Sequence, residues 1–263
     1  MSDSSIDSGP VLVDHRGAVR LITLNRPHLR NAIDFPMRYA LADAIEEAMN
    51  DADVRALVIT GGGGAFCSGG DISTMGPLTP DQARTRLEAA QRVIKAIWNG
   101  SKPVVAAVEG PAFGAGAGLA LGCDRVVAAR DSSFGTTFTA IGLSGDMGIS
   151  VSLPARIGVP AARQLLRLPR RIGGEEAGRL GLADSVVEPG TALESALADA
   201  DRLAQGPPLA LAAIKSQMGR PERNRFDVLD DEVENQVALW QSDDFAEGVA
   251  AFKEKRTARF LGR

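Results

Sequence analysis

The sequence has little of the chemistry from which metal sites and disulfides are built. Its 263 residues include two cysteines, Cys67 and Cys123, and two histidines, His15 and His28. They form no Cys-x-x-Cys pair and no Cys/His cluster, so we expect two reduced, packed cysteines and no metal site. Neither histidine belongs to a recognisable catalytic motif, and we expect both to lie at the surface.

Long hydrophobic runs and a strong excess of one charge are also missing. No apolar stretch approaches 18 residues without a polar interruption, which excludes a membrane-spanning helix. Residues 1–10 lack the cationic start and apolar segment of a secretory signal, so we expect a flexible tail there and a cytoplasmic location. The net charge of −4 argues against nucleic acid or an anionic membrane as a partner.

What is present is an alternation of short apolar runs with helical patterns. Because 44% of the residues are hydrophobic, the chain can bury a sizeable core. Asp34 is expected to cap one helix, and a capping box at Thr79 and Gln82 is expected to begin another, with Ala83, Leu87, Ala90, Ile94 and Ile97 facing inward. The alternation predicts an α/β fold. Strands are expected at 11–14, 19–24, 56–60, 104–108 and 125–128.

Strand signals end near residue 187, and helical patterns follow. We expect helices at 192–204, 208–218, 225–240 and 245–260. The predicted organisation is therefore a tail over residues 1–10, an α/β core over residues 11–195 and a helical region over residues 196–263.

Two strand-to-helix junctions are rich in small residues. One reads AFCSGGDI over residues 65–72, and the other reads GPAFGAGAGL over residues 110–119. A helix start leaves backbone N–H groups unpaired, and small residues let a ligand approach them closely. Two such junctions can together form an oxyanion hole. The alternatives are tight packing or a nucleotide loop, although neither G-x-G-x-x-G nor G-x-x-x-x-G-K-[ST] is present.

These two junctions, Leu24-Asn-Arg-Pro27 with Asn31-Ala32, and the ending Glu247 to Arg256 resemble the crotonase (enoyl-CoA hydratase/isomerase) superfamily. The resemblance extends from about residue 11 to the C-terminus. It implies a spiral of ββα units and an acyl-CoA thioester as substrate, with no separate cofactor. It also implies a homo-oligomer, a trimer or a dimer of trimers, assembled through the C-terminal helical region.

The resemblance also implies catalytic positions. Ser68 and Ala115 would donate the two oxyanion N–H groups, although Ser68 can also be a simple turn residue. The two glutamates of a hydratase would fall at Gly118 and Phe138, which carry no carboxylate. Asp146 matches an aspartate of dienoyl-CoA isomerases and of the ring-expanding isomerase of phenylacetate breakdown. It is therefore predicted as a proton shuttle, with capping of the next helix as the alternative.

Binding residues follow from the same resemblance. Arg30, Ala32, Ser68, Gly70, Asp71 and Ile72 are expected to line the pantetheine channel. Lys255 is expected to reach the coenzyme A of a neighbouring subunit, unless it is simply solvated. Asp71 and Asp124 are also expected to cap or to make buried hydrogen bonds, and Glu109 is expected to be structural.

The predicted reaction is a shift of a double bond in an enoyl-CoA thioester, through an oxyanion-stabilised enolate, with Asp146 moving the proton. One alternative is an enoyl-CoA hydratase whose water is held by Thr136, Thr137 or Asp146. Another is a non-catalytic protein that binds acyl-CoA. A serine hydrolase is the remaining alternative, but it needs a histidine close to Ser68.

Overall fold

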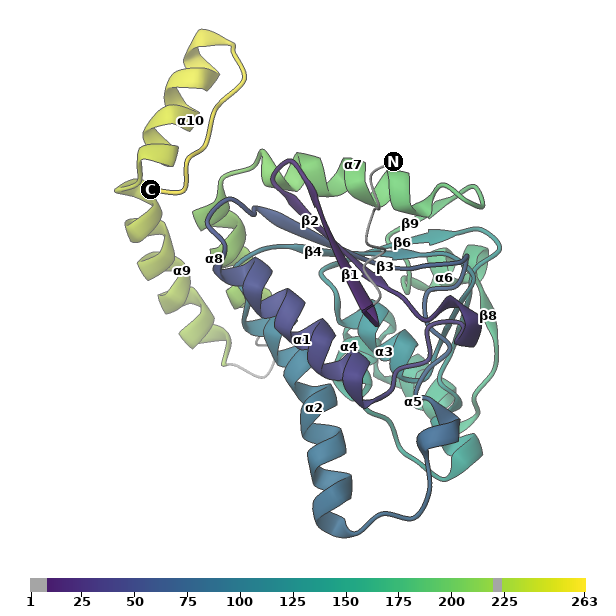
Figure 1. Ribbon diagram of the computed structural model, residues 1–263. Helices are drawn as coiled ribbons and strands as arrows, with labels where there is room; N and C mark the ends of the chain where they lie inside the picture. The colour runs from purple at the N-terminus through teal and green to yellow at the C-terminus, as the bar shows by residue number, and fades with distance from the viewer. Residues whose placement is uncertain (1–8, 220–223) are drawn as a thin grey trace, which may run out of the picture.

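A six-stranded sheet forms the centre of the computed structural model, which describes residues 9–219 and 224–263 (Figure 1). The expected tail at residues 1–10 lies outside this range except for residues 9 and 10. The sheet order is β1-β2-β3-β4-β6-β9, in which β1 and β2 are antiparallel and the other neighbours are parallel. Its strands are β1 Val11–Arg16, β2 Val19–Leu24, β3 Ala56–Gly61, β4 Val104–Val108, β6 Arg125–Ala129 and β9 Ser185–Val187.

Helices cover both faces of this sheet (Figure 1). Alternate strand residues point to opposite sides, so each strand serves two cores. On one side Val58 and Val105 pack with α7 (Ala192–Ala204), and on the other Leu57 and Val104 belong to the core that includes α1 (Phe35–Asn50). Burial on both sides explains why the central strands read as continuous apolar runs.

A second, three-stranded sheet lies beside the junctions. It contains β5 (Pro111–Phe113), β7 (Ser133–Gly135) and β8 (Ile172–Gly173), with β5 parallel to β7 and β7 antiparallel to β8. The remaining helices are η1 Pro27–Leu29, η2 Ile72–Thr74, α2 Pro80–Asn99, α3 Ala115–Gly122, η3 Thr137–Ile141, α4 Ile149–Ile157, α5 Val159–Arg167, α6 Gly174–Leu180, α8 Pro208–Met218, α9 Arg225–Trp240 and α10 Asp243–Glu254. This mixed α/β architecture confirms the predicted fold class.

The local helix signals are confirmed, with two corrections. Asp34 caps α1 by accepting from the Met37 N–H, and the capping box of Thr79 begins α2. Leu87 was expected inward, but 53% of it is exposed, and Arg86 takes the buried position instead. The last helix ends at Glu254 rather than near residue 260, because Lys255 adopts the left-handed conformation (φ 55°).

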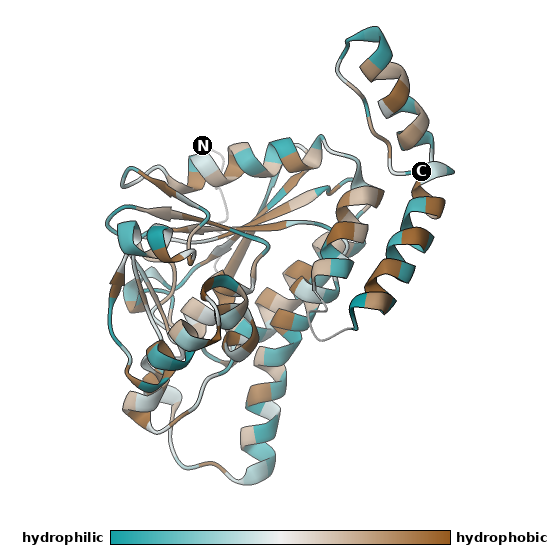
Figure 2. Ribbon diagram, turned by 180° about the vertical axis from the view of Figure 1, so that it is seen from behind, coloured by the Kyte–Doolittle hydropathy of each residue, from teal (hydrophilic) through white to brown (hydrophobic). Residues whose placement is uncertain are grey.

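The C-terminal helices differ in what they touch. The expected boundary after residue 195 falls inside α7, and the whole of α7 packs on the sheet as part of the core. Helices α9 and α10 extend away from the sheet, and α9 carries hydrophobic residues along its length (Figure 2). In residues 9–219 and 224–263, no helix is both long and apolar enough to cross a membrane.

Candidate active site

The two small-residue junctions are interlocked by backbone hydrogen bonds. The Cys67 N–H donates to the Pro111 carbonyl and the Phe113 N–H donates to the Cys67 carbonyl, both at 2.9 Å. A Cβ on Gly116 would lie 2.4 Å from the Cys67 carbonyl oxygen, so only glycine allows this approach. The chain from Ala65 to Gly70 is therefore held against the start of α3.

Several backbone N–H groups at this contact are left free, among them one from each junction. In the described part of the chain, the N–H groups of Gly70 and Ala115 have no acceptor. Gly70 faces Ile33 in a parallel bridge whose two hydrogen bonds are made by the neighbours of Gly70. The Ile33 N–H donates to the Gly69 carbonyl and the Asp71 N–H donates to the Ile33 carbonyl, so the Gly70 N–H takes no part. A Cβ on Gly69 would lie 3.9 Å from the Ala115 nitrogen. Free donors on touching segments can stabilise an anionic oxygen.

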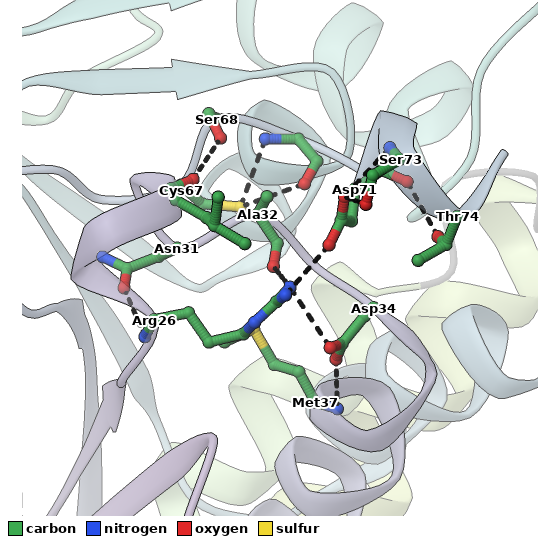
Figure 3. Close-up of polar contacts among 12 residues, drawn as sticks. Arg26, Asn31, Ala32, Asp34, Met37, Cys67, Ser68, Asp71, Ser73 and Thr74 are labelled. Carbon is green, nitrogen blue, oxygen red and sulfur yellow. Dashed lines mark hydrogen bonds and ion pairs between the residues drawn. The ribbon is translucent and has the colours of Figure 1, made fainter.

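Ser68 does not have the donor role that the sequence predicts. Its N–H donates to the Arg30 carbonyl at 2.9 Å. Its hydroxyl donates to the Leu29 carbonyl at 3.1 Å (Figure 3). With both groups engaged, Ser68 fastens the loop after η1. The free donor on this junction is Gly70, two residues later, which the sequence placed only in the binding channel.

Arg26 organises the loop that Ser68 fastens (Figure 3). Its guanidinium donates to the Ala32 carbonyl at 2.6 Å and pairs with Asp71 at 2.9 Å and with Asp34 at 3.2 Å. Hydrogen bonds from Ser73 and Arg26 lower the pKa of the Asp71 carboxyl. Asp71 therefore has the capping and buried hydrogen-bonding role expected of it.

The predicted channel residues accordingly lie in one place. Arg30 is exposed in the left-handed conformation (φ 49°), and Ile72 is exposed at the start of η2. Gly70 pairs with Ile33 in a parallel bridge, and Ala32 precedes Ile33. Lys255 does not join them, because α10 stands away from the sheet (Figure 1).

The two positions of the hydratase glutamates carry no carboxylate, and position 118 leaves little room for one. A Cβ on Gly118 would lie 2.7 Å from the Met147 Cβ and 3.2 Å from the Asp146 carbonyl oxygen. Phe138 is buried, and its ring lies 3.8 Å from the point where a Cβ on Gly114 would be. The segment containing Asp146 therefore occupies the space into which a side chain at position 118 would extend.

Asp146 has a carboxylate that is mostly enclosed. Helix α4 begins at Ile149 with Gly148 as its N-cap, so the Asp146 side chain does not cap the helix, contrary to the alternative interpretation. Within the described residues, its Oδ1 is buried and has no hydrogen-bond partner. Burial raises the pKa of Asp146, while the charges of Arg38 and Arg86 act in the opposite direction. A buried carboxyl group with a raised pKa suits proton transfer.

Arg38 and Arg86 are the site residues that the sequence interpretation missed. Arg38 lies on the buried face of α1 with Leu41 and Ala42, and Arg86 lies on the buried face of α2. The signal was available, because an arginine in phase with the apolar positions of a helix must enter the core.

The sequence matches the enoyl-CoA hydratase/isomerase family over residues 14–263. The chain belongs to this family. It is 40% identical to a protein of Rhodobacter capsulatus named probable enoyl-CoA hydratase, over 92% of this chain and 94% of the relative. It is 35% identical to the 1,2-epoxyphenylacetyl-CoA isomerase of Escherichia coli, over 93% of this chain and 95% of the relative. The enoyl-CoA hydratase structure from Polaromonas superposes with a TM-score of 0.92 at 35% identity, over 96% of this chain and all of that one.

Family membership makes the chain an enzyme of hydratase/isomerase type, and the other polar residues singled out have structural partners. Glu109 accepts from the N–H groups of Gly190 and Ala192, and Asp124 accepts from the Val104 N–H and the Lys215 ammonium. The structural role expected of Glu109 and the capping or hydrogen-bonding role expected of Asp124 are confirmed.

The cysteines and histidines also lie where they were expected. Cys67 and Cys123 are buried free thiols, and burial raises the pKa of each to about 12. His15 and His28 are exposed. The Ser68 hydroxyl donates to a carbonyl rather than to an imidazole, which removes the basis for a serine hydrolase.

Proposed function

We propose that this enzyme shifts a double bond in an enoyl-CoA thioester. The observation that carries the proposal is the Asp146 carboxylate, which is mostly enclosed and has an unpartnered oxygen, on a residue whose backbone carbonyl lies against Gly118. Gly70 and Ala115 would bind the thioester oxygen through their free N–H groups. A single carboxylate near these donors suits proton transfer between two carbons of the same substrate.

In the proposed reaction, ionised Asp146 takes a proton from one carbon of the acyl chain. The electron pair of that C–H bond moves toward the thioester carbonyl and leaves negative charge on its oxygen. The N–H groups of Gly70 and Ala115 stabilise this enolate, and one such donor is typically worth on the order of 10²–10³ in rate. The proton on the Asp146 carboxyl exchanges with the solvent before Asp146 delivers a proton to another carbon, so the product is labelled in deuterated water although no water is consumed.

Hydration is the second candidate, because the Rhodobacter capsulatus relative is named a hydratase. A hydratase must hold and activate a water, and in this chain Gly118 and Phe138 stand in place of the two glutamates. Thr136, one of the groups considered for holding that water, donates its hydroxyl to the Leu165 carbonyl. Asp146 would have to activate the water with little help.

The test is incubation of the enzyme with a panel of enoyl-CoA thioesters in deuterated water, followed by mass spectrometry and NMR. We expect products that carry deuterium on carbon but have gained no oxygen. A hydrated product formed at a rate ordinary for the family would establish the second candidate. Tight binding of every thioester without exchange or product would show an acyl-CoA-binding protein that does no chemistry.

The exposed apolar residues of α9 and α10 support assembly with further copies of the chain. Leu229, Val233, Val237 and Trp240 line a groove on α9, and Phe252 lies exposed on α10. A homotrimer, or a dimer of trimers, would cover these side chains. Lys255 would then contact the coenzyme A of a neighbouring subunit. The cellular location that we propose is the cytoplasm.

Sedimentation velocity at micromolar concentration tests the assembly. Val233→Glu should dissociate the oligomer because it places a charge on the apolar groove, and Glu234→Gln outside the groove is the matched control. A stable wild-type monomer would overturn the assembly and, with it, the role of Lys255.

A further inference from the structure

Two arginines meet in the core between α1 and α2. Arg38 is 2% exposed and Arg86 is 8% exposed, although arginine is rarely buried to this extent without a partner. Both guanidinium groups lie over the ring of Phe35, with 5.7 Å from its centre to the Arg38 carbon and 5.4 Å to the Arg86 carbon. Two positive charges therefore share one aromatic ring.

This pair has no anionic partner within bonding distance in the described part of the chain. The Nε and Nη1 atoms of Arg38 are buried without a hydrogen bond. Among the described residues, Arg86 donates only to the neutral hydroxyl and carbonyl oxygens of Thr74, at 3.3–3.5 Å. Burial and the charge of Arg86 lower the pKa of Arg38.

Another buried arginine shows what an ordinary arrangement looks like. Arg20 also has an unpartnered Nε, but its Nη2 binds the Asp51 carboxylate at 2.7 Å. The nearest acidic side chains do not serve Arg38 in this way. Asp34 is paired with Arg26, and Asp146 acts on Arg38 through its charge without a hydrogen bond or ion pair. A buried cation in this state is strongly favoured to bind an anion.

The arginine pair lies next to the proposed reaction centre. Arg38 Nη2 is 3.9 Å from the point where a Cβ on Gly70 would be, and Gly70 carries one of the two N–H groups proposed to bind the thioester oxygen. The positive charges of both arginines act to lower the pKa of Asp146. An acyl chain whose thioester oxygen is held by Gly70 and Ala115 would have Asp146 and the two guanidinium groups around it.

We propose that Arg38 and Arg86 form an anion subsite for a carboxylate at the far end of the acyl group. The preferred substrates would then be monothioesters of dicarboxylic acids. The two planar forks can bind both carboxylate oxygens, which a neutral alkyl end cannot offer. This proposal rests on the proposed function in one respect: it requires that the acyl group of the thioester enters beside Gly70 and Asp146.

Binding of saturated thioesters tests this without any turnover. Calorimetry would compare pairs of equal chain length: butyryl-CoA with succinyl-CoA, pentanoyl-CoA with glutaryl-CoA, and hexanoyl-CoA with adipyl-CoA. In at least one pair we expect the carboxylated member to bind about 10-fold or more tightly. Arg38→Met should abolish that preference and leave affinity for the uncharged member within a few-fold. Arg84→Met, on the exposed side of α2, should change neither affinity.

Equal affinities within every pair for the wild-type protein would overturn the subsite, whether or not the Arg38 variant folds. Equal loss of both members in Arg38→Met would show that Arg38 only positions Asp146. The two proposals can fail separately. If no deuterium is incorporated but the preference for the carboxylated thioester persists, the proposed reaction is wrong and the anion subsite stands.

Discussion

The two halves of the candidate site are built on different principles. One half consists of the backbone N–H groups of Gly70 and Ala115, whose flanking segments are held by hydrogen bonds such as those joining Cys67 to Pro111 and Phe113. The other half consists of the side chains of Asp146, Arg38 and Arg86. It contains buried nitrogen and oxygen atoms without partners within the described residues.

The backbone N–H groups are a consequence of the fold, whereas the buried charged side chains are explained by chemistry at the site. A helix start and a strand bridge leave N–H groups free as a by-product of secondary structure. Buried charges with unsatisfied atoms are unfavourable for folding, so their presence together points to function. The backbone half defines the class of reaction, and the side-chain half defines which proton moves and which acyl group is accepted.

Replacing Asp146 tests the side-chain half most directly. Asp146→Asn keeps the size of the side chain but cannot accept a proton, so kcat should fall by about 10²–10⁴. Deuterium incorporation into the best thioester of the panel is the measurement, and Asp131→Asn, at an exposed position, is the control. Full activity in Asp146→Asn would show that another group moves the proton.

Gly118→Glu tests whether the side-chain half can be returned to a hydratase arrangement. A Cβ at position 118 would lie 2.7 Å from that of Met147, so we expect a loss of about 1–3 kcal/mol in the free energy of unfolding and no gain in hydration. Urea unfolding of Gly118→Ala isolates the Cβ contribution. Gly173→Ala is the matched control, because nothing lies within 4 Å of a Cβ there. Equal stability of these two alanine variants would contradict the steric argument.

The pH dependence of stability measures the cost of the Asp146 charge. Burial raises its pKa in the folded state, so the folded protein binds the proton more tightly than the unfolded chain. The free energy of unfolding should therefore fall as pH rises from the ordinary aspartate value through the raised one, by about 1.4 kcal/mol for each tenfold difference in proton affinity.

Asp146→Asn should lack this pH-dependent contribution and be at least as stable as the wild type at neutral pH. Thermal unfolding of both proteins over a pH series is the measurement. Parallel stability curves would show that the Asp146 carboxylate has no raised pKa.

Ser68→Ala should have the smallest effect, and it tests the backbone half. The substitution removes the hydrogen bond to the Leu29 carbonyl but keeps the N–H bond to Arg30. We expect kcat to change by no more than a few-fold and stability to fall by about 0.5–1.5 kcal/mol. A loss of activity as large as that of Asp146→Asn would mean that the Ser68 hydroxyl takes part in the reaction.

Much of the fold and part of the site follow from signals that lie close together in the sequence. The cap of Asp34 and the capping box of Thr79 depend on hydrogen bonds to residues three positions away. The continuous apolar runs of β3 and β4 predict strands that are buried on both faces, and such a run is also a signal among neighbouring residues. Asp146 is singled out by the family resemblance, since it matches an aspartate of related isomerases in a chain whose Gly118 and Phe138 carry no carboxylate.

The remaining features depend on contacts between distant segments. Which N–H of the first junction is free depends on Arg30, which lies 38 residues before Ser68 and takes the Ser68 donor. The inward position on α2 belongs to Arg86 rather than Leu87, because the helix turns that side chain toward Phe35. Hydrophobicity alone ranks a leucine inside and an arginine outside, although Arg86 is in phase with the apolar positions of α2.

The sequence by itself determined the family, the α/β class, the helix caps and the absence of both hydratase carboxylates. Only the tertiary structure decided that Gly70 is the free donor, that Met147 fills the space beside Gly118 and that the charges of Arg38 and Arg86 act on Asp146. The physical reason is that caps and periodicity are set by neighbours along the chain. Free donors, filled space and shifted pKa values are set by whatever packs against a residue from elsewhere in the fold.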